Sequence, residues 1–194
     1  MGIVLLFGVS ACSEIIKIRP IPTPGPPLVE ISQPSSIDVS LTTNGKPVRI
    51  VAEAVDLDAP VVEMGWRLEE WGGQVVSEWN VPEFESGWHQ NSALPGQGDN
   101  VVISGHNNSS GGHVFGNLEA LIVGDQITLW TDENESFVYQ VSEKQIVRAF
   151  AASQESLNYL QAIMESTSSE QLTLITCWPS WTNTHRLIIV AHPL

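Results

Sequence analysis

Short runs of β-branched and other apolar residues, separated by turn-forming residues, recur along the chain from residue 45 onward. Such runs predict β-strands, because branched side chains pack well on a pleated surface and Gly, Pro, Asn and Asp interrupt it. The predicted strands cover residues 48–55, 61–66, 74–79, 101–104, 126–130, 136–147, 172–176 and 187–191. Eight or so short strands with turns between them predict an all-β barrel or sandwich.

Two stretches have helical rather than strand character. Residues 117–122 suit a single turn, and residues 153–164 predict an amphipathic helix, with apolar residues on one face behind a Ser-x-x-Ser start. These apolar residues are Leu157, Leu160, Ile163 and Met164. No internal repeat is evident, and 194 residues are enough to bury one core. We therefore expect one all-β domain with short helices over residues 46–194.

The segment before this domain has a different composition. Residues 1–12 form an apolar run that ends in Val-Ser-Ala-Cys, similar to the lipidation site of a bacterial lipoprotein, with Cys12 as the lipid anchor. No Lys or Arg precedes the run, so a truncated membrane anchor remains an alternative. Either interpretation places the domain outside the cytoplasm, anchored to the cell membrane. Residues 13–45 predict a Pro-rich linker that acts as a semi-rigid spacer, with an arm packed on the domain as the alternative.

The charge balance excludes one class of partner. The chain has 8 Lys and Arg against 22 Asp and Glu, a net charge of −14. Nucleic-acid binding needs clustered cations that contact phosphates, and this chain has no such cluster. The same balance argues against an electrostatic hold on anionic lipids, so any membrane attachment depends on the N-terminus.

Three residues with catalytic potential stand at predicted strand ends. His106 follows the strand 101–104, Cys177 ends the strand 172–176, and Arg186 begins the strand 187–191. If the last two strands pair antiparallel, Cys177 and Arg186 face each other. Taken singly, each residue has an ordinary alternative: a buried inert thiol, a loop histidine and a surface cation.

No metal site or cofactor is predicted. His89 lies 17 positions before His106 and His113 lies 7 after it, but no carboxylate or cysteine falls at a recognisable ligand spacing.

Several segments together resemble the sortase family over residues 46–193. They are Gly87-Trp88-His89 through Ser104-Gly105-His106, then Val114-Phe115-Gly116-Asn117-Leu118 with Val123-Gly124-Asp125, then Leu174-Ile175-Thr176-Cys177, and finally Arg186-Leu187-Ile188-Ile189-Val190. The order His, Cys, Arg also suits this family. Papain-like proteases have the cysteine before the histidine, and the Ser-His-Gly-Cys segment of L,D-transpeptidases is absent.

The resemblance implies an eight-stranded sortase-type β-barrel, and the short loop before Arg186 is similar to those of classes D, E and F. It implies a cysteine transpeptidase that cleaves a Leu-Pro-x-Thr-Gly-like C-terminal sorting motif through a thioester on Cys177. The acyl group then passes to an amine of a peptidoglycan cross-bridge or a pilin lysine. His106 is the expected general acid, and Arg186 the expected clamp for the oxyanion or substrate.

Three further residues are expected to contact the substrate. They are Thr176, through its hydroxyl, Trp178, as a wall of the groove, and His185 in the loop before the last strand. Two alternatives remain: a hydrolytic sortase that uses water as acceptor, and a non-catalytic β-rich lipoprotein that binds cell-envelope ligands.

Overall fold

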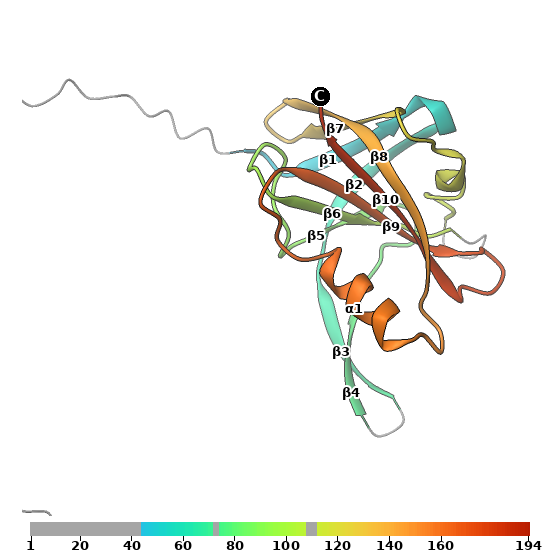
Figure 1. Cartoon of the computed structure of the whole chain (residues 1–194). Helices are drawn as coiled ribbons and strands as arrows, with labels where there is room; N and C mark the ends of the chain where they lie inside the picture. Colours follow the sequence, from blue (N-terminus) through green and yellow to red (C-terminus); the bar gives the residue numbers. More distant parts are fainter. Residues whose placement is uncertain (1–43, 72–73, 108–111) are drawn as a thin grey trace, which may run out of the picture. The chain divides into compact units, whose positions relative to one another are not determined.

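The computed structural model describes residues 44–71, 74–107 and 112–194. Eight strands form a closed barrel in the order β1-β2-β5-β6-β9-β10-β8-β7, and β3 and β4 form a separate hairpin (Figure 1). The barrel strands are β1 (Pro47–Ala52), β2 (Leu57–Met64), β5 (Ser86–His89), β6 (Asn100–Ser104), β7 (Gln126–Thr131), β8 (Ser136–Arg148), β9 (Gln171–Trp178) and β10 (His185–Pro193). The all-β class and the eight-stranded barrel predicted from the sequence are both confirmed.

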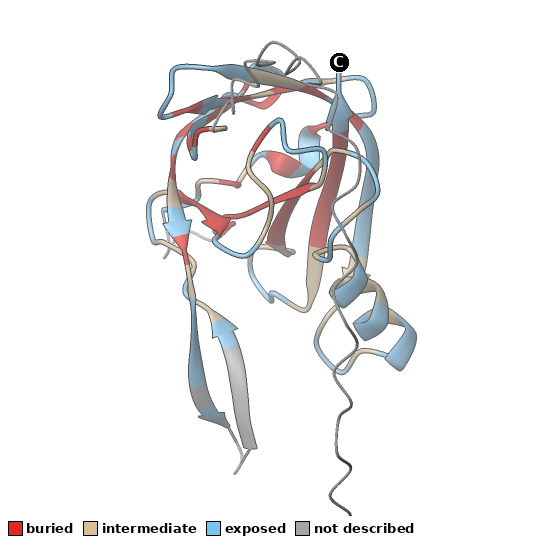
Figure 2. Ribbon diagram, turned by 90° about the vertical axis from the view of Figure 1, so that its left-hand side faces the viewer, coloured by how far each residue is buried: buried red, intermediate tan, exposed pale blue. Residues whose placement is uncertain are grey.

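The core fills the inside of this barrel. Side chains alternate between the two faces of a strand, so every second residue of a barrel strand points inward. On β6 and β9 the inward residues include Val101, Ile103, Leu172 and Leu174, all fully buried in one apolar cluster. Figure 2 shows buried residues gathered in the barrel strands, whereas α1 and the described parts of the hairpin are largely exposed. The residues between these core positions therefore face the outside of the barrel wall.

Two parts of the strand prediction differ from the structure. Residues 74–79 form β4, which pairs with β3 (Trp66–Trp71) outside the barrel. The eighth barrel strand is instead β5, which sequence patterning did not identify. β5 has only four residues, all buried, so it shows no alternation of apolar and polar residues.

The helical predictions are confirmed with shorter bounds. The 3₁₀ turn η2 covers Leu118–Ala120, another 3₁₀ turn, η1, covers Glu53–Val55, and α1 covers Gln154–Ala162. Ser153 caps α1, because its hydroxyl accepts a hydrogen bond from the backbone N–H of Ser156 at 3.2 Å. No residue of α1 is buried, so the apolar face of the helix is not packed into the core.

The expected anchor at Cys12 and most of the Pro-rich linker lie outside the described residues. Among the residues that the structure describes, no helix is long and apolar enough to cross a membrane.

Candidate active site

The sheet topology brings the three predicted catalytic residues to one end of adjacent strands. β9 pairs in parallel with β6, with Ile175 opposite Ser104, and antiparallel with β10, with Cys177 opposite Arg186. His106 is the second residue after the end of β6, at the same end of the sheet. Residues directly opposite in an antiparallel pair project to the same face, so Cys177 and Arg186 are side-chain neighbours.

These residues open onto a cleft on the outer face of the barrel, with a volume of about 620 Å³. This volume lies within the range of sites that hold small molecules or short peptide segments. The cleft is lined by Arg67, Glu78, Trp79, Asn80, Val81, His89, Ser104, Gly105, His106, Ala149, Leu157, Leu160, Met164, Ile175, Thr176, Cys177 and Arg186. Cys177 is a half-buried free thiol, as its place at the edge of the cleft requires.

Two side-chain hydrogen bonds, in addition to the backbone bond from Gly105 N–H to the carbonyl of Ile175 at 3.2 Å, join the segment that carries His106 to the strand that carries Cys177. The Thr176 hydroxyl donates to the carbonyl of Gly105 at 2.7 Å, and the Asn107 side-chain amide donates to the carbonyl of Cys177 at 2.9 Å. Both side chains are buried. The bonds therefore flank His106 on either side in sequence and tie its segment to β9, so that His106 and Cys177 line the same cleft.

Gly105 permits this close approach. A Cβ atom at Gly105 would lie 2.8 Å from the ring of Phe115, which is fully buried. The backbone N–H of Phe115 in turn donates to the carbonyl of His106 at 2.8 Å. A larger residue at position 105 would displace the segment that carries His106.

The Arg186 guanidinium is held by backbone oxygens of the loop between β9 and β10. Its Nη1 donates to the carbonyl of Asn183 at 3.2 Å and to that of His185 at 3.1 Å. A guanidinium has five N–H donors, so this arrangement leaves donors for a ligand in the cleft. The side chain is half-buried at the edge of the cleft.

Trp178 and His185, two predicted substrate contacts, do not line the cleft. They lie opposite each other in the β9–β10 pair, one position beyond Cys177 and Arg186. Alternation therefore places them on the other face of the pair, where Trp178 packs against the core. Their rings meet edge to face at 5.7 Å between centroids. Thr176, the third predicted contact, borders the cleft, but its hydroxyl proton is already bonded to Gly105.

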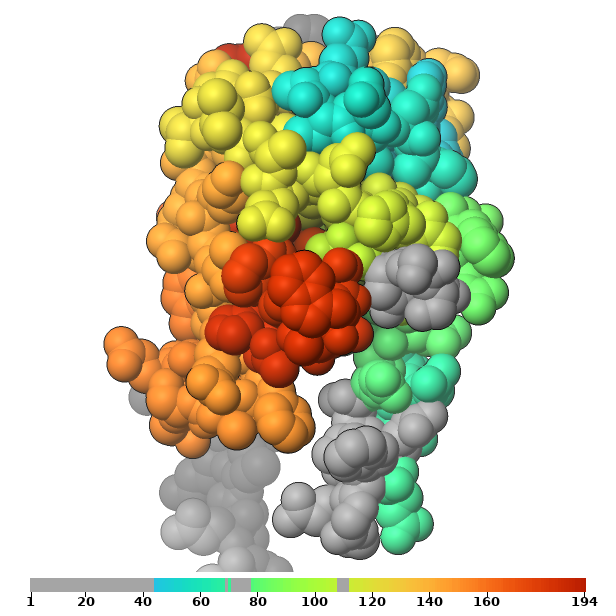
Figure 3. Space-filling view, turned by 90° about the vertical axis from the view of Figure 1, so that its right-hand side faces the viewer, coloured from blue at the N-terminus to red at the C-terminus, as the bar shows by residue number. Residues whose placement is uncertain are grey.

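Two elements outside the barrel form the walls of the cleft. α1 and the turn after it contribute Leu157, Leu160 and Met164, so the apolar face of the helix lines the cleft rather than the core. The base of the β3–β4 hairpin contributes the opposite, more polar wall. Figure 3 shows α1 in orange beside the red β9–β10 loop.

The α1 wall is fixed at its C-terminal end by the start of β6. The Asn100 side chain donates to the carbonyls of Ile163 and Glu165, each at 2.9 Å. The neighbouring Asp99 carboxylate accepts from the Ser166 hydroxyl at 2.5 Å and from the Thr167 N–H at 2.6 Å. These bonds hold the pKa of Asp99 at about 2, below its ordinary value.

The floor of the cleft contains two paired side chains, His89 and Ser104, to which the sequence assigned no role in the site. His89 Nε2 lies 2.8 Å from Ser104 Oγ, and the His89 ring lies 4.0 Å from that of Trp79, tilted by 46°. Burial lowers the pKa of His89 to about 4, so its imidazole is neutral at neutral pH. Ser104 was recognisable only as part of the segment before His106, and His89 lies in the strand that showed no alternation.

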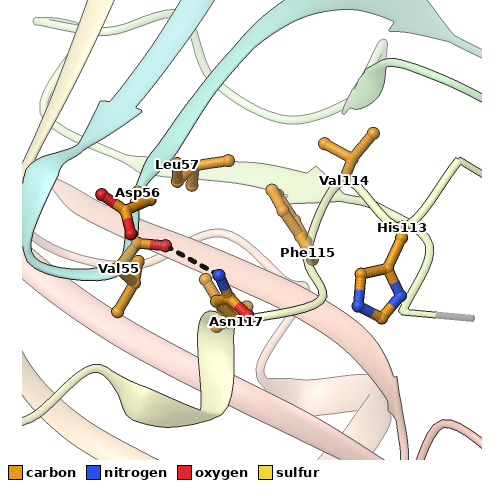
Figure 4. A pocket seen from close by; sticks show the side chains of 8 residues that line it. Val55, Asp56, Leu57, His113, Val114, Phe115 and Asn117 are labelled. Atoms are coloured by element: carbon orange, nitrogen blue, oxygen red, sulfur yellow. Dashed lines mark hydrogen bonds between the residues drawn. The ribbon is translucent and has the colours of Figure 1, made fainter.

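His113 does not line the cleft. It lines a small cavity of about 80 Å³ beside η1 and η2, where the Asn117 amide donates to the carbonyl of Val55 at 3.3 Å (Figure 4). His89, in contrast, lines the cleft. Within the described ranges, no group of three His, Cys, Asp or Glu side chains is arranged to hold a metal ion.

Comparison with known proteins gives one consistent family. A family model described as "Sortase domain" matches residues 50–194. A protein of Bacillus subtilis (strain 168) named as a sortase candidate, YwpE, is 30% identical over 90 residues, which cover 46% of this chain and 78% of that protein.

Solved structures of sortases are also similar to this chain. A lid mutant of sortase A from Corynebacterium diphtheriae has a TM-score of 0.57 at 27% identity, covering 77% of this chain and 71% of that one. Sortase C1 from Streptococcus agalactiae has a TM-score of 0.57 at 26% identity, covering 82% and 70%. The family model extends over nearly the whole barrel, including the cleft with His106, Cys177 and Arg186, and the chain therefore belongs to the sortase family.

Proposed function

We propose that this protein is a cysteine transpeptidase that cleaves a Leu-Pro-x-Thr-Gly-like sorting motif and transfers the acyl group to an amine. The observation that carries the proposal is the meeting of His106, Cys177 and Arg186 at one cleft, with Cys177 directly opposite Arg186. The order of these residues along the chain and their strand-end positions match the pattern of the family.

In the first half-reaction, the Cys177 thiolate attacks the carbonyl carbon of the motif's threonine. The carbonyl oxygen takes up the negative charge, and the free donors of Arg186 are placed to bind it. His106, as imidazolium, gives its proton to the departing glycine nitrogen when the C–N bond breaks. The products are a thioester on Cys177, a free amine and a neutral His106.

In the second half-reaction, an acceptor amine attacks the thioester carbon. His106 takes the proton that the amine loses, the C–S bond breaks, and the thiolate returns. An amide replaces the amide that was cleaved, so no oxidant, metal or other co-reactant is needed. Water in place of the amine would give the hydrolytic variant of the same chemistry.

Thr176 and Asn107 act in this scheme as positioning residues. Each donates a hydrogen bond across the gap between the His106 segment and β9. They keep the imidazole and the thiol at the same edge of the cleft without contacting the reacting atoms.

We also propose that the protein works outside the cytoplasm, held at the membrane by its N-terminal segment. Support comes from the apolar run that ends in Cys12 and from the Pro-rich stretch that separates it from the barrel. Substrates with a C-terminal sorting motif and an amine of the cell wall or of a pilin would meet at this location.

Mass spectrometry of the full chain tests the proposal. The protein is incubated with a library of Leu-Pro-x-Thr-Gly-like peptides, with and without simple amines, beside Cys177→Ala. We expect an acyl-enzyme or an amine-capped product with the wild type and neither with the variant. If Cys177 stays unmodified across peptides, amines and pH 6–9, the transpeptidase proposal fails and a non-catalytic binding module is the better interpretation.

A further inference from the structure

The tip of the loop between β9 and β10 takes no part in the reaction above, although it carries a large apolar side chain. Trp181 is 81% exposed, more than any other large apolar side chain in the described residues. The backbone N–H groups of Thr182 and Asn183 both donate to the carbonyl of Pro179, at 3.2 and 3.0 Å, and close a turn around Trp181. A hydrogen-bonded turn therefore holds this side chain out in solvent.

The end of β8 lies beside this loop and adds two more exposed apolar side chains (Figure 1). Phe150 is 70% exposed and Ile146 is 41% exposed. The backbone N–H of Phe150 donates to the carbonyl of Thr184 at 2.9 Å, and Arg148 is opposite His185 in the pairing of β8 with β10. We call the surface at this end of the sheet the strand-end patch, and its members are Ile146, Arg148, Phe150 and Trp181.

The segments that form the strand-end patch contain no carboxylate side chain. The chain has 22 Asp and Glu, but none of them falls within residues 144–154 or 171–194. Other exposed apolar side chains have acidic neighbours, because Phe84 stands between two glutamates and Leu68 is followed by two. Single apolar residues among charges are ordinary on a protein surface, whereas exposed apolar side chains that are grouped together indicate an interaction site.

The cation of this patch has no acidic partner. Arg148 is exposed, and its Nε donates to the carbonyl of Phe150 at 3.0 Å. A guanidinium has five N–H donors, so most of them remain available. No ion pair of Arg148 is present among the residues that the structure describes. Glu143, the acid on the same strand, lies on its opposite face, because an odd number of positions separates it from Arg148.

These features fit a membrane surface that carries anionic lipid headgroups. Aromatic side chains, and tryptophan above all, favour the boundary between headgroups and acyl chains, which accommodates an apolar ring and a polar N–H together. An arginine beside them is suited to bind a lipid phosphate. The net charge of −14 repels such a membrane from most of the chain, so the face without carboxylates is the one that can approach it.

The N-terminal segment alone does not select which face of the domain meets the membrane. At about 3.1 Å per residue, an extended linker over residues 13–45 spans roughly 100 Å. This length exceeds the roughly 40 Å width of a compact domain of about 150 residues. A domain on such a tether can turn any face toward the membrane, so a second contact would decide its orientation.

We propose that the strand-end patch docks on an anionic membrane surface, with Trp181 and Phe150 in the headgroup region and Arg148 on a lipid phosphate. Ala149 lines the cleft and Phe150 is the next residue, so this contact places the cleft beside the bilayer. The inference goes beyond the proposed function, because it concerns orientation at the membrane and is measured without turnover.

Quenching by brominated lipids tests the docking directly. The full chain is bound to vesicles of phosphatidylcholine and phosphatidylglycerol, with acyl chains that are either brominated or not, and flotation checks that each variant is bound. Because the chain has 7 tryptophans, the emission of Trp181 is obtained as the difference between the wild type and Trp181→Phe. We expect this difference emission to shift to shorter wavelength on the vesicles and to be quenched by the brominated lipid.

The matched control for this measurement is Trp130→Phe. Trp130 is 40% exposed, but it lies opposite Ser136 at the start of β8, the other end of that strand from Arg148. The difference emission of Trp130 should not be quenched. Equal quenching of the two tryptophans would mean that the domain meets the membrane with no preferred face, which overturns the proposal.

Changes of charge test whether the headgroup is anionic. Arg148→Gln should lower the ratio of docked to free Trp181 about fivefold, the usual contribution of one cation near an anionic membrane surface. Arg49→Gln removes an exposed cation opposite Trp130, where it pairs with Asp58, and should leave this ratio unchanged. Equal quenching on vesicles of pure phosphatidylcholine, or no effect of Arg148→Gln, overturns the assignment to anionic lipid.

Three further outcomes would overturn the docking itself. The first is a full chain that does not float with the vesicles, and the second is a bound chain whose Trp181 emission is neither shifted nor quenched. The third is the same spectral shift with soluble polyphosphate, which would mean that the patch binds a polyanion rather than a bilayer. Turnover of a soluble sorting peptide should be the same in the wild type and Trp181→Phe, because Trp181 does not line the cleft. Failure of the transpeptidase assay would therefore leave the quenching result unaffected.

Discussion

Cys177 and Arg186 are directly opposite each other across the antiparallel strands β9 and β10, with their side chains on the outer face of the barrel. The guanidinium is further fixed by the carbonyls of Asn183 and His185. A cation on the residue opposite the thiol is suited to stabilise an oxyanion formed at the thiol. The pairing register therefore sets the relationship between the proposed nucleophile and the proposed clamp.

Replacing Arg186 should lower turnover with little effect on folding. We expect Arg186→Ala to reduce kcat/KM by about 10²- to 10³-fold, the usual cost of removing one oxyanion donor. Arg186→Lys should recover only part of this loss, because an ammonium keeps the charge but not the planar set of donors. Steady-state kinetics with a fluorogenic sorting peptide measure both effects.

Arg148→Ala is the matched control for Arg186. Arg148 lies on β8, opposite His185, and its Nε donates to the carbonyl of Phe150 outside the residues that line the cleft. The Arg148→Ala variant should retain nearly full activity. Equal losses in the two variants would mean that the arginine acts only through the net charge of the protein.

Asn107 should matter for both stability and turnover. Asn107→Ala leaves the part-buried carbonyl of Cys177 without the side-chain donor of Asn107 and removes one of the bonds that fix the segment carrying His106. We expect a loss of about 1–2 kcal/mol in the free energy of unfolding and a decrease in kcat of about tenfold or more. Urea denaturation and single-turnover acylation measure the two effects.

The control for Asn107 is Asn117→Ala. Its amide makes the same kind of bond, to the carbonyl of Val55, but beside the separate small cavity. The Asn117→Ala variant should lower the free energy of unfolding without lowering kcat. If both variants lose stability and neither loses kcat, Asn107 has no positioning role.

The sequence was sufficient to predict the barrel and to place the three predicted catalytic residues at strand ends. Strand alternation is a local property, so the strand that ends at Cys177 and the strand that begins near Arg186 were recognisable, and the antiparallel pairing on which their meeting depends is present. The same rule explains why two of the predicted substrate contacts do not line the cleft. Trp178 and His185 are adjacent in sequence to Cys177 and Arg186, but each neighbour on a strand points to the opposite face.

The rest of the site depends on contacts between distant segments. His89 and Ser104 are 15 residues apart, and Asn107 and Cys177 are 70 apart, so no local pattern marks these bonds. The apolar face of α1 was predicted, but amphipathicity does not say whether such a face packs on the core or lines a cleft. Only the tertiary structure distinguishes the two.

The proposed N-terminal anchor leads to a prediction of its own. If Cys12 carries the lipid, cells that express the full chain with an alkyne-bearing fatty acid should label the wild type and not Cys12→Ser. Cys177→Ser controls for labelling of the other cysteine and should remain labelled. An unlabelled wild type that still sediments with membranes would favour an apolar membrane anchor over lipidation.

The buried, neutral His89 should make the stability of the protein depend on pH in the mildly acidic range. Burial lowers the pKa of His89 to about 4 in the folded protein, whereas an unfolded histidine titrates near 6.5. Between these values the unfolded chain binds a proton that the folded chain does not, so the stabilisation is complete above about pH 6.5 and is lost as the pH falls toward 4. The slope of the free energy of unfolding against pH approaches about 1.4 kcal/mol per pH unit.

We therefore expect the wild type to lose stability on acidification more steeply than His89→Gln, which cannot titrate. Urea unfolding at several values between pH 4 and 7 measures the difference, with the exposed His192→Gln as the control. Parallel curves for the wild type and His89→Gln would mean that the pKa of His89 is the same in the folded and the unfolded protein, which would contradict the effect of burial.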